Sequence, residues 1–250
     1  MKIQLTSFIN DMPGEERVEI TKEIINISEA DLLLFSGHTI ENSFEIENLR
    51  LLIENNNTEV IFELESMDTE RLNNCLYHIK DGKIQNLYTN QIFTDSEDIK
   101  DNRELADRLI HEFETRRRLN INGYSILIIQ GEEINILNTI GLDNNIEFVL
   151  SKEKELSKRF KKIISETDIF LNPKHAPITD QVNIGKIREY LSKNKKYYFS
   201  SSNTEEFSYN LEINNLQYAL FNKKDIIEIE KYSIEGGLEI YQAINRVYEI

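Results

Sequence analysis

The chain has 250 residues, of which 40% are hydrophobic and 29% charged, as in a folded globular protein. Its formal net charge of −15 repels phosphate backbones, which argues against nucleic acid as a partner. The single cysteine, Cys75, excludes an intramolecular disulfide and a cysteine-rich zinc site, and no apolar run reaches the ~20 residues of a membrane span. We therefore expect a cytoplasmic protein that binds neither nucleic acid nor membranes.

The first part of the chain predicts alternating strands and helices. Lys2–Phe8 alternates as a half-buried strand does, and Glu15–Ser28 places isoleucines close to helical spacing. Asp31–Phe35 is a short, continuously apolar run, as expected of a strand that is covered on both faces. A second helix is predicted over Ser43–Glu54, and a strand follows over Val60–Glu65.

The middle of the chain predicts a hairpin and a third helix. Asn74–Ile79 and Lys83–Tyr88 flank Asp81-Gly82, a pair that favours a tight hairpin turn. Apolar residues from Leu105 to Phe113 mark a helix that runs into the cluster Arg116–Arg118. Because positive charge in the last turn complements the helix dipole, we interpret these arginines as solvated.

The remaining elements alternate again before the chain becomes strand-rich. Tyr124–Ile129 is a second continuously apolar strand, and a polar helix follows over roughly Lys152–Ser165. A strand at Asp168–Leu171, a helix around Ile184–Leu191 and a strand at Lys196–Ser200 come next. Three later segments are strand-like: Phe207–Ile213, Leu216–Phe221 and Ile226–Tyr232.

Five short segments carry motifs in a characteristic order. They are Ala30–Gly37 (ADLLLFSG), Asn74–Phe93 (NCLYHIKDGKIQNLYTNQIF), Asn122–Leu137 (NGYSILIIQGEEINIL), Asp168–Thr179 (DIFLNPKHAPIT) and Arg188–Asn203 (REYLSKNKKYYFSSSN). Together they resemble the strands, hairpin, elbow and later loop of the carbon–nitrogen hydrolase (nitrilase) superfamily, over roughly residues 1–205.

The resemblance implies a fold and an assembly state. The fold is α/β, a four-layer α-β-β-α sandwich, which we expect to form one domain over residues 1–250. Family members commonly pair their subunits through helices and C-terminal strands, so a homo-oligomer, most simply a dimer, is expected. We expect no cofactor and no metal ion, and a small polar ligand or a protein partner remains open.

The resemblance also identifies the positions of a catalytic set that this chain lacks. Members of the family cleave non-peptide amides or nitriles with a cysteine nucleophile, a glutamate base and a lysine that stabilises the tetrahedral intermediate. The corresponding residues here are Gln130 for the cysteine, Gly37 for the glutamate and Asn90 for the lysine, or Gln91 if the alignment slides by one. Glycine cannot move a proton and a carboxamide is not a nucleophile. The sequence thus predicts a catalytically degenerate protein, a pseudoenzyme with a binding, scaffold or assembly role.

Four polar residues near predicted strand ends are candidates for a pocket: His38, Glu132, Glu133 and His175. Loops at strand ends converge on ligand sites in α/β sheets, although we favour local hydrogen bonds for these side chains. Without helical spacing they are a weak metal signal. One alternative is a carbon–nitrogen hydrolase that uses Glu132 or Glu133 with His38 for direct attack by water. Another abandons the family for an unrelated α/β binding module.

Three other groups receive a structural interpretation. Glu63 is interpreted as an exposed strand residue. Cys75 shares one strand face with Tyr77 and Ile79 and is interpreted as a buried thiol rather than a nucleophile. The charged run Lys193–Lys196 is interpreted, like the arginines, as solvated surface.

Overall fold

The computed structural model describes two β-sheets that pack face to face. The described residues are 1–8, 14–37, 39–40, 45–54, 56–68, 71–88, 102–131, 133, 154–174, 191, 193–202, 209–212, 217–220, 226–232 and 238–250. The first sheet contains β1 (Lys2–Ser7), β2 (Leu32–Phe35), β3 (Glu59–Asp68), β4 (Arg71–Lys80), β5 (Lys83–Tyr88), β12 (Ile226–Tyr232) and β13 (Leu238–Glu249). The second contains β6 (Arg118–Ile121), β7 (Tyr124–Ile128), β8 (Ile169–Lys174), β9 (Tyr197–Ser202), β10 (Tyr209–Glu212) and β11 (Gln217–Leu220).

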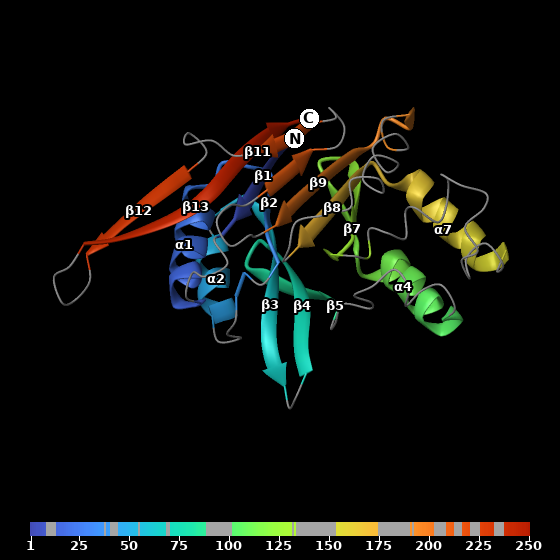
Figure 1. The fold of residues 1–250 in the computed structure, drawn as a ribbon, viewed down its shortest axis with the longest axis horizontal. Helices are drawn as coiled ribbons and strands as arrows, with labels where there is room; N and C mark the ends of the chain where they lie inside the picture. The colour runs from blue at the N-terminus through green and yellow to red at the C-terminus, as the bar shows by residue number, and fades with distance from the viewer. Residues whose placement is uncertain are drawn as a thin grey trace.

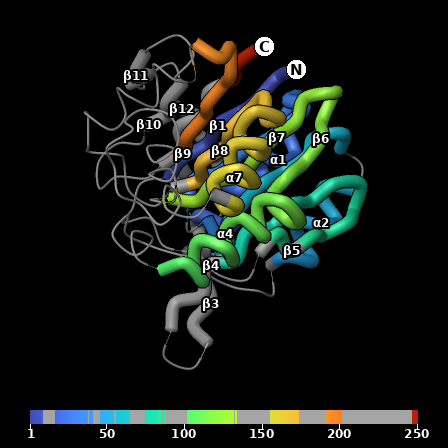
Figure 2. The backbone as a smooth tube through the Cα atoms, turned by 90° about the vertical axis from the view of Figure 1, so that its right-hand side faces the viewer, coloured from blue at the N-terminus to red at the C-terminus, as the bar shows by residue number. Residues whose placement is uncertain are grey.

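Helices lie outside both sheets (Figure 1). They are α1 (Gly14–Ile27), α2 (Glu45–Ile53), α4 (Arg103–Thr115) and α7 (Lys154–Glu166). Apolar residues of α1 and α2 form one core with the outer side of β2 and β3, where Phe8 stacks on Phe35. On the other side of the molecule α4 and α7 lie side by side (Figure 2). Between them Phe113 stacks on Phe160, with 6.1 Å between ring centroids. The layered α/β sandwich predicted from the sequence is confirmed.

The strands at the centre of each sheet run parallel. The first sheet has the order β12-β13-β1-β2-β3-β4-β5, with β1, β2 and β3 parallel; the second has the order β11-β10-β9-β8-β7-β6, with β7, β8 and β9 parallel. Between the sheets, β1 packs against β9 and β2 against β8. The carboxyl ends of these strands therefore meet at one edge of the sandwich, the edge at which ligands bind in α/β sheets.

A fully buried apolar core fills the space between the sheets. Register aligns its residues in rows across neighbouring strands. The row nearest the carboxyl edge consists of Leu5, Leu34 and Ile61 in the first sheet and Ile128, Leu171 and Phe199 in the second, all with no exposed surface. Because strands covered on both faces need apolar residues on both, this core accounts for the continuous apolar runs of β2 and β7.

The hairpin between β4 and β5 forms at the predicted turn, and a second hairpin joins β6 and β7. Asp81 and Gly82 both have positive φ, at 48° and 67°, as a two-residue turn between twisted strands requires. Asn122 and Gly123 repeat this geometry between β6 and β7, with φ of 51° and 86°. These residue pairs tolerate left-handed backbone better than others do.

Two strands were not predicted. The sequence predicts a helix that runs into Arg116–Arg118 and no strand after it, but α4 ends at Thr115 and Arg118–Ile121 forms β6. No element is predicted for Leu238–Glu249, yet it forms β13, which hydrogen-bonds to β1 and to β12. The helix predicted around Ile184–Leu191 lies almost entirely outside the described residues.

Candidate functional site

Two of the three positions matched to the catalytic set lie at the carboxyl edge of the sandwich. Gly37 follows the end of β2 and is buried. Gln130 follows the end of β7 and is 2% exposed. The third position, Asn90, lies outside the described residues, as do His38, Glu132 and His175 of the candidate pocket.

In the first sheet, a row of polar residues lies directly above the apolar core. The Ser36 N–H donates to Thr6 O at 2.9 Å, which places Ser36 beside Ser7. The parallel register of β2 and β3, carried beyond Leu34, places Ser36 beside Glu63 on its other side. Since side chains on one face of a strand recur every second residue, these three side chains share the face of the inner core.

The second sheet continues in the same way above its own apolar row. Pro173 pairs with Ser201, and Ile129 N–H donates to Leu171 O at 2.8 Å. This pairing places Gln130 beside Pro173 at the end of β7. Gln130 and Ser201 therefore follow the inner face of the second sheet, as Ser36 follows that of the first.

The two rows face one another across the sandwich. Ser7 Oγ and Ser201 Oγ lie 2.7 Å apart, so β1 and β9 meet at this level. In the order of the two sheets, β3, which carries Glu63, corresponds to β7, after which Gln130 follows. We call Ser7, Ser36, Glu63, Gln130 and Ser201 the polar layer; all five are at most 2% exposed.

At one end of the polar layer, the serine hydroxyls have hydrogen-bond partners within the protein. Ser201 Oγ donates to Thr6 O at 2.7 Å in addition to its contact with Ser7. At the other end, Gln130 Oε1 and Ser36 Oγ have no hydrogen-bond partner among the described residues. Buried polar atoms are nearly always hydrogen-bonded in native proteins, so these two atoms distinguish this end of the layer from the Ser7–Ser201 end.

The burial of Glu63 contradicts its sequence-based interpretation. It was expected to be an exposed strand residue, but it is 2% exposed and lies on the inner face of β3 with Ile61. The error has a physical reason: Val60, Phe62 and Leu64 face the helices while Ile61 and Glu63 face the second sheet, so neither face of segment 60–64 meets solvent. The alternation of residues along this segment separates two buried faces, not a buried face from an exposed one.

The cluster Arg116–Arg118 is also not solvated as a whole. The Arg117 side chain has no exposed surface and forms an ion pair with Glu133, which is equally buried. Arg117 Nη2 donates to Glu133 Oε1 at 3.2 Å, and the Arg117 guanidinium lies 5.4 Å from the centre of the Phe113 ring. Because α4 ends before this residue, its side chain turns into the protein instead of continuing along the helix surface.

Glu133 also contacts the backbone of Gln130. Glu133 Oε2 accepts the backbone N–H of Gln130 at 3.0 Å, so the carboxylate holds the elbow after β7 in place. Both oxygens of this carboxylate are thus engaged by the Arg117 guanidinium, and one of them also by a backbone amide. Glu133 is therefore a positioning residue for Gln130.

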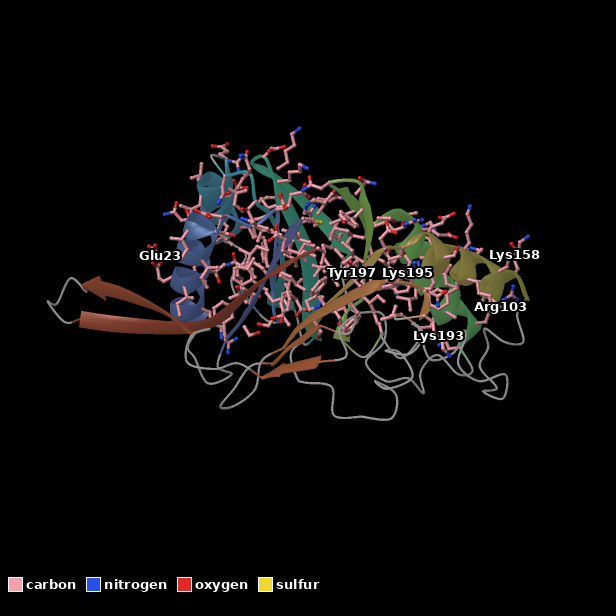
Figure 3. All side chains as sticks on the ribbon, turned by 90° about the horizontal axis from the view of Figure 1, so that it is seen from above. Glu23, Arg103, Lys158, Lys193, Lys195 and Tyr197 are labelled. Carbon is pink, nitrogen blue, oxygen red and sulfur yellow. The ribbon has the colours of Figure 1, made fainter. Side chains whose placement is uncertain are left out.

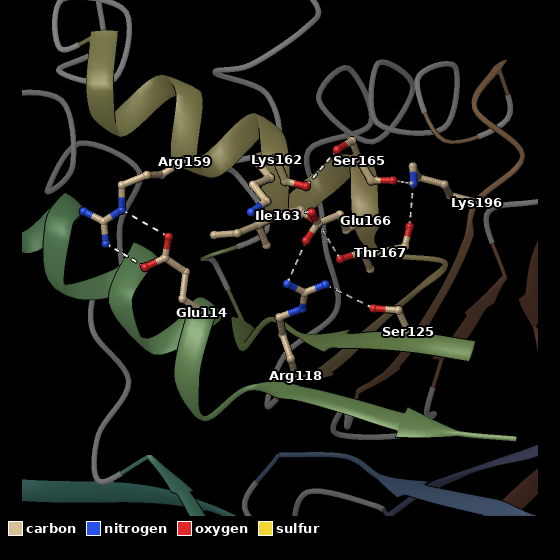
Figure 4. A network of polar contacts seen from close by, with 10 residues as sticks. All are labelled: Glu114, Arg118, Ser125, Arg159, Lys162, Ile163, Ser165, Glu166, Thr167 and Lys196. Carbon is tan, nitrogen blue, oxygen red and sulfur yellow. Dashed lines mark hydrogen bonds and ion pairs between the residues drawn. The ribbon is translucent and has the colours of Figure 1, made fainter. Parts of the chain in front are cut away.

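Lysines of the charged run Lys193–Lys196 differ in their environments. Lys193 and Lys195 are exposed, as predicted (Figure 3). Lys196 is only 8% exposed, and its ammonium donates to Ser165 O at 3.0 Å and to Thr167 O at 2.5 Å (Figure 4). Burial lowers the pKa of Lys196, and the lysine closes the carboxyl end of α7, a place that favours a cation.

Cys75 is half-buried rather than buried, on the strand face that also carries Tyr77 and Ile79.

Within the described part of the chain, no group of three or more His, Cys, Asp and Glu residues could hold a metal ion. No described helix has the length and apolar character needed to cross a membrane. The described site is therefore built from carboxamides, hydroxyls and carboxylates.

Comparison with solved structures decides which fold this is. No family model matches the sequence, and no curated protein matches it significantly. The chain is similar to XC1258 from Xanthomonas campestris, a CN-hydrolase superfamily protein with an arsenic adduct in the active site. The TM-score is 0.52 at 12% identity, and the superposition covers 100% of this chain and 90% of XC1258. The chain has the nitrilase fold.

A second nitrilase-like neighbour is larger than this chain. A glutamine-dependent NAD(+) synthetase from Cytophaga hutchinsonii has a TM-score of 0.48 at 11% identity, over 98% of this chain and 43% of the synthetase. The fold rests on XC1258 alone, and a likeness at 12% identity leaves the activity open. Within that fold, the polar layer was not predicted from the sequence; a signal for it was the carboxylate of Glu63 between the apolar residues Phe62 and Leu64.

Proposed function

We propose that this chain is a catalytically degenerate nitrilase-fold protein whose role is to bind a ligand rather than to hydrolyse one. The observation that carries the proposal is Gln130, a buried carboxamide at the elbow after β7, where the family resemblance requires a nucleophilic cysteine. Acyl transfer through a covalent intermediate needs a nucleophile, and an amide side chain cannot supply one.

Two further residues support this proposal. Gly37 stands where the resemblance requires the general base, and it has no side chain that could move a proton. Glu133, the described member of the proposed non-standard acid/base set, is committed to Arg117 and to the Gln130 N–H. The alternative hydrolase would have to depend on Glu132 and His38.

The test is a turnover assay of the purified protein over a broad panel of amides and nitriles. We expect no hydrolysis by the wild type. The triple variant Gly37→Glu/Asn90→Lys/Gln130→Cys provides a matched comparison, because it restores the residue types of the family at the three positions. Wild-type turnover that disappears in Glu132→Gln would overturn the proposal in favour of the alternative hydrolase.

A further inference from the structure

We propose that the outward face of α7 is a docking surface for an acidic segment of another protein. We call this surface the lysine ridge. Its members are exposed and are Lys158, Lys161, Lys162, Ser165, Lys193 and Lys195. The ridge lies on the outside of the sandwich, so the inference goes beyond the proposed function and does not depend on whether the protein hydrolyses amides or nitriles.

The periodicity of α7 gives the ridge a charge of one sign. The helix packs on the protein through four apolar residues that are at most 4% exposed: Leu156, Phe160, Ile163 and Ile164. At 3.6 residues per turn, positions 158, 161, 162 and 165 lie on the opposite side of the helix, where residues three and four apart are neighbours. Three lysines and one serine occupy these positions, so this face of α7 is cationic.

The acidic residues of α7 lie to one side of the ridge. Glu155 and Glu166 are four and seven residues away from Arg159, whose guanidinium bonds to carboxylates of α4, so all three face towards α4. Glu166 contacts Arg118 at 3.1 Å and Lys162 at 3.8 Å. The Lys162 side chain is still 74% exposed, so this contact leaves its charge at the surface.

The other two lysines extend the ridge past the last turn of α7. The Lys196 ammonium donates to Ser165 O and to Thr167 O, which holds the segment before β9 beside this turn. Lys193 and Lys195 belong to that segment, and Figure 3 shows them on the side of the molecule that carries α7. The cationic surface therefore runs along the helix and beyond its carboxyl end.

The charge of the whole molecule restricts which anion can use the ridge. The chain carries a formal net charge of −15, so an anion that presents phosphates over a wide area, such as a membrane or a nucleic acid duplex, also meets repulsion from the acidic surface. Attraction to the ridge is screened beyond about 8 Å at physiological ionic strength. A single acidic helix or extended segment, about 10 Å wide, can contact the ridge without covering the rest of the surface.

The residue type of the ridge favours several carboxylates over one. Lysine is a hydrated point charge on a flexible stem, whereas arginine presents a planar fork that suits bidentate recognition of a single anionic group. A row of lysines thus responds to the number and spacing of the opposing charges. Neighbouring ridge positions on α7 are about 5–6 Å apart at Cβ, a spacing that acidic residues three or four apart on a partner helix reproduce.

The experiment measures the fluorescence anisotropy of a labelled peptide of ten glutamates during titration with the purified protein, at low and at physiological salt. We expect saturable binding that weakens as salt is added, and no binding of a labelled glycine–serine peptide of the same length. Lys158→Glu/Lys162→Glu should weaken binding of the glutamate peptide about tenfold, because two attractions become repulsions. Lys2→Glu/Lys83→Glu changes the net charge equally at exposed positions of β1 and β5, and binding should stay within about twofold of the wild type.

A second variant protects the test against misfolding. If Lys158→Glu/Lys162→Glu does not fold, Lys158→Gln/Lys161→Gln removes two charges of the ridge and leaves the contact between Lys162 and Glu166 in place. This variant should weaken binding of the glutamate peptide about threefold.

Three results would overturn the inference. The first is a wild type that does not bind the glutamate peptide at low salt. The second is equal weakening by the ridge variant and by Lys2→Glu/Lys83→Glu, which would assign the binding to net charge instead of the ridge. The third is tighter binding of phosphatidylserine vesicles, or of a single strand of ten thymidine nucleotides, than of the glutamate peptide at the same ionic strength.

Discussion

The Arg117–Glu133 ion pair ties the end of α4 to the elbow that carries Gln130. Both side chains are fully buried, and a buried charge that loses its partner is left without solvation. We therefore expect Arg117→Met and Glu133→Gln each to lower the free energy of unfolding, by about 3–5 kcal/mol for the arginine. Urea denaturation followed by circular dichroism measures both.

The matched control for this prediction removes the two charges together. In Arg117→Met/Glu133→Leu no isolated charge remains, so a substantial part of the lost stability should return. If the double variant is as unstable as the sum of the single ones, the two side chains do not act as a pair.

Glu59 makes the stability of the protein dependent on pH. Burial alone raises the pKa of Glu59, but hydrogen bonds from His78, at 2.8 Å from Nε2 to Oε2, and from Lys80 outweigh it and hold the pKa below its ordinary value of 4.5. A carboxyl with a lowered pKa in the folded state stabilises the protein above its unfolded pKa, and this stabilisation is lost as the pH falls through the folded pKa.

The expected result is a fall in the free energy of unfolding as the pH decreases below about 4.5, which is smaller in Glu59→Gln than in the wild type. Urea denaturation at a series of pH values, from neutral to acidic, measures the free energy of unfolding of both proteins. Glu155→Gln, an exposed position on α7, is the control and should retain the wild-type slope. Parallel pH curves for Glu59→Gln and the wild type would contradict the assignment.

At the scale of secondary-structure elements, Arg159 joins α7 to α4. Its Nε and Nη2 donate to the two oxygens of Glu114 at 3.1 and 2.8 Å, and Nη1 donates to Asp107 at 2.5 Å (Figure 4 shows the bonds to Glu114). Hydrogen bonds from Arg159 lower the pKa of Glu114. A fork of this kind depends on the planar guanidinium, which an ammonium does not reproduce.

We expect Arg159→Met to destabilise the protein by about 0.5–1 kcal/mol, because the side chains involved are partly exposed and solvent screens their charges. Arg159→Lys should recover little of this loss. Lys158→Met, an exposed neighbour on the same helix, should have no effect. The midpoints of urea denaturation for the three variants test this, and an unchanged midpoint in Arg159→Met would show that the contacts of Arg159 do not stabilise the protein.

The elements show where sequence reasoning succeeds and where it fails. Helices with an apolar stripe, such as α4, and tight turns, such as Asp81-Gly82, were predicted because their signals are local. Glu63, Arg117 and Lys196 were misjudged because burial of a charge depends on what the rest of the fold places against it. No local pattern contains that information, and for Glu63 the alternation of the strand pointed the wrong way.

For the molecule as a whole, assembly also depends on what the fold places at the surface, which no local sequence pattern contains. β1 pairs with residues 244–249 of β13, whereas β12 pairs with residues 238–244. The part of the β12–β13 ribbon beyond β1 therefore has no third strand in the described structure, and it extends past α1 at the side of the molecule (Figure 1). Two-stranded ribbons are marginally stable alone, and the free edge of β12 offers backbone groups to a further strand.

We expect a second copy of the chain to supply that strand, giving a homodimer. Light scattering coupled to size-exclusion chromatography should report about twice the monomer mass of 29.4 kDa. Replacing Ile227 and Ile229 by lysine places charge along the β12 edge, which disfavours edge-to-edge pairing, and should shift the mass towards the monomer. Ile27→Lys changes an exposed isoleucine at the end of α1 and should leave the dimer intact. A wild type that remains monomeric at high concentration, or an edge variant that remains dimeric while folded, would exclude β12 as the interface.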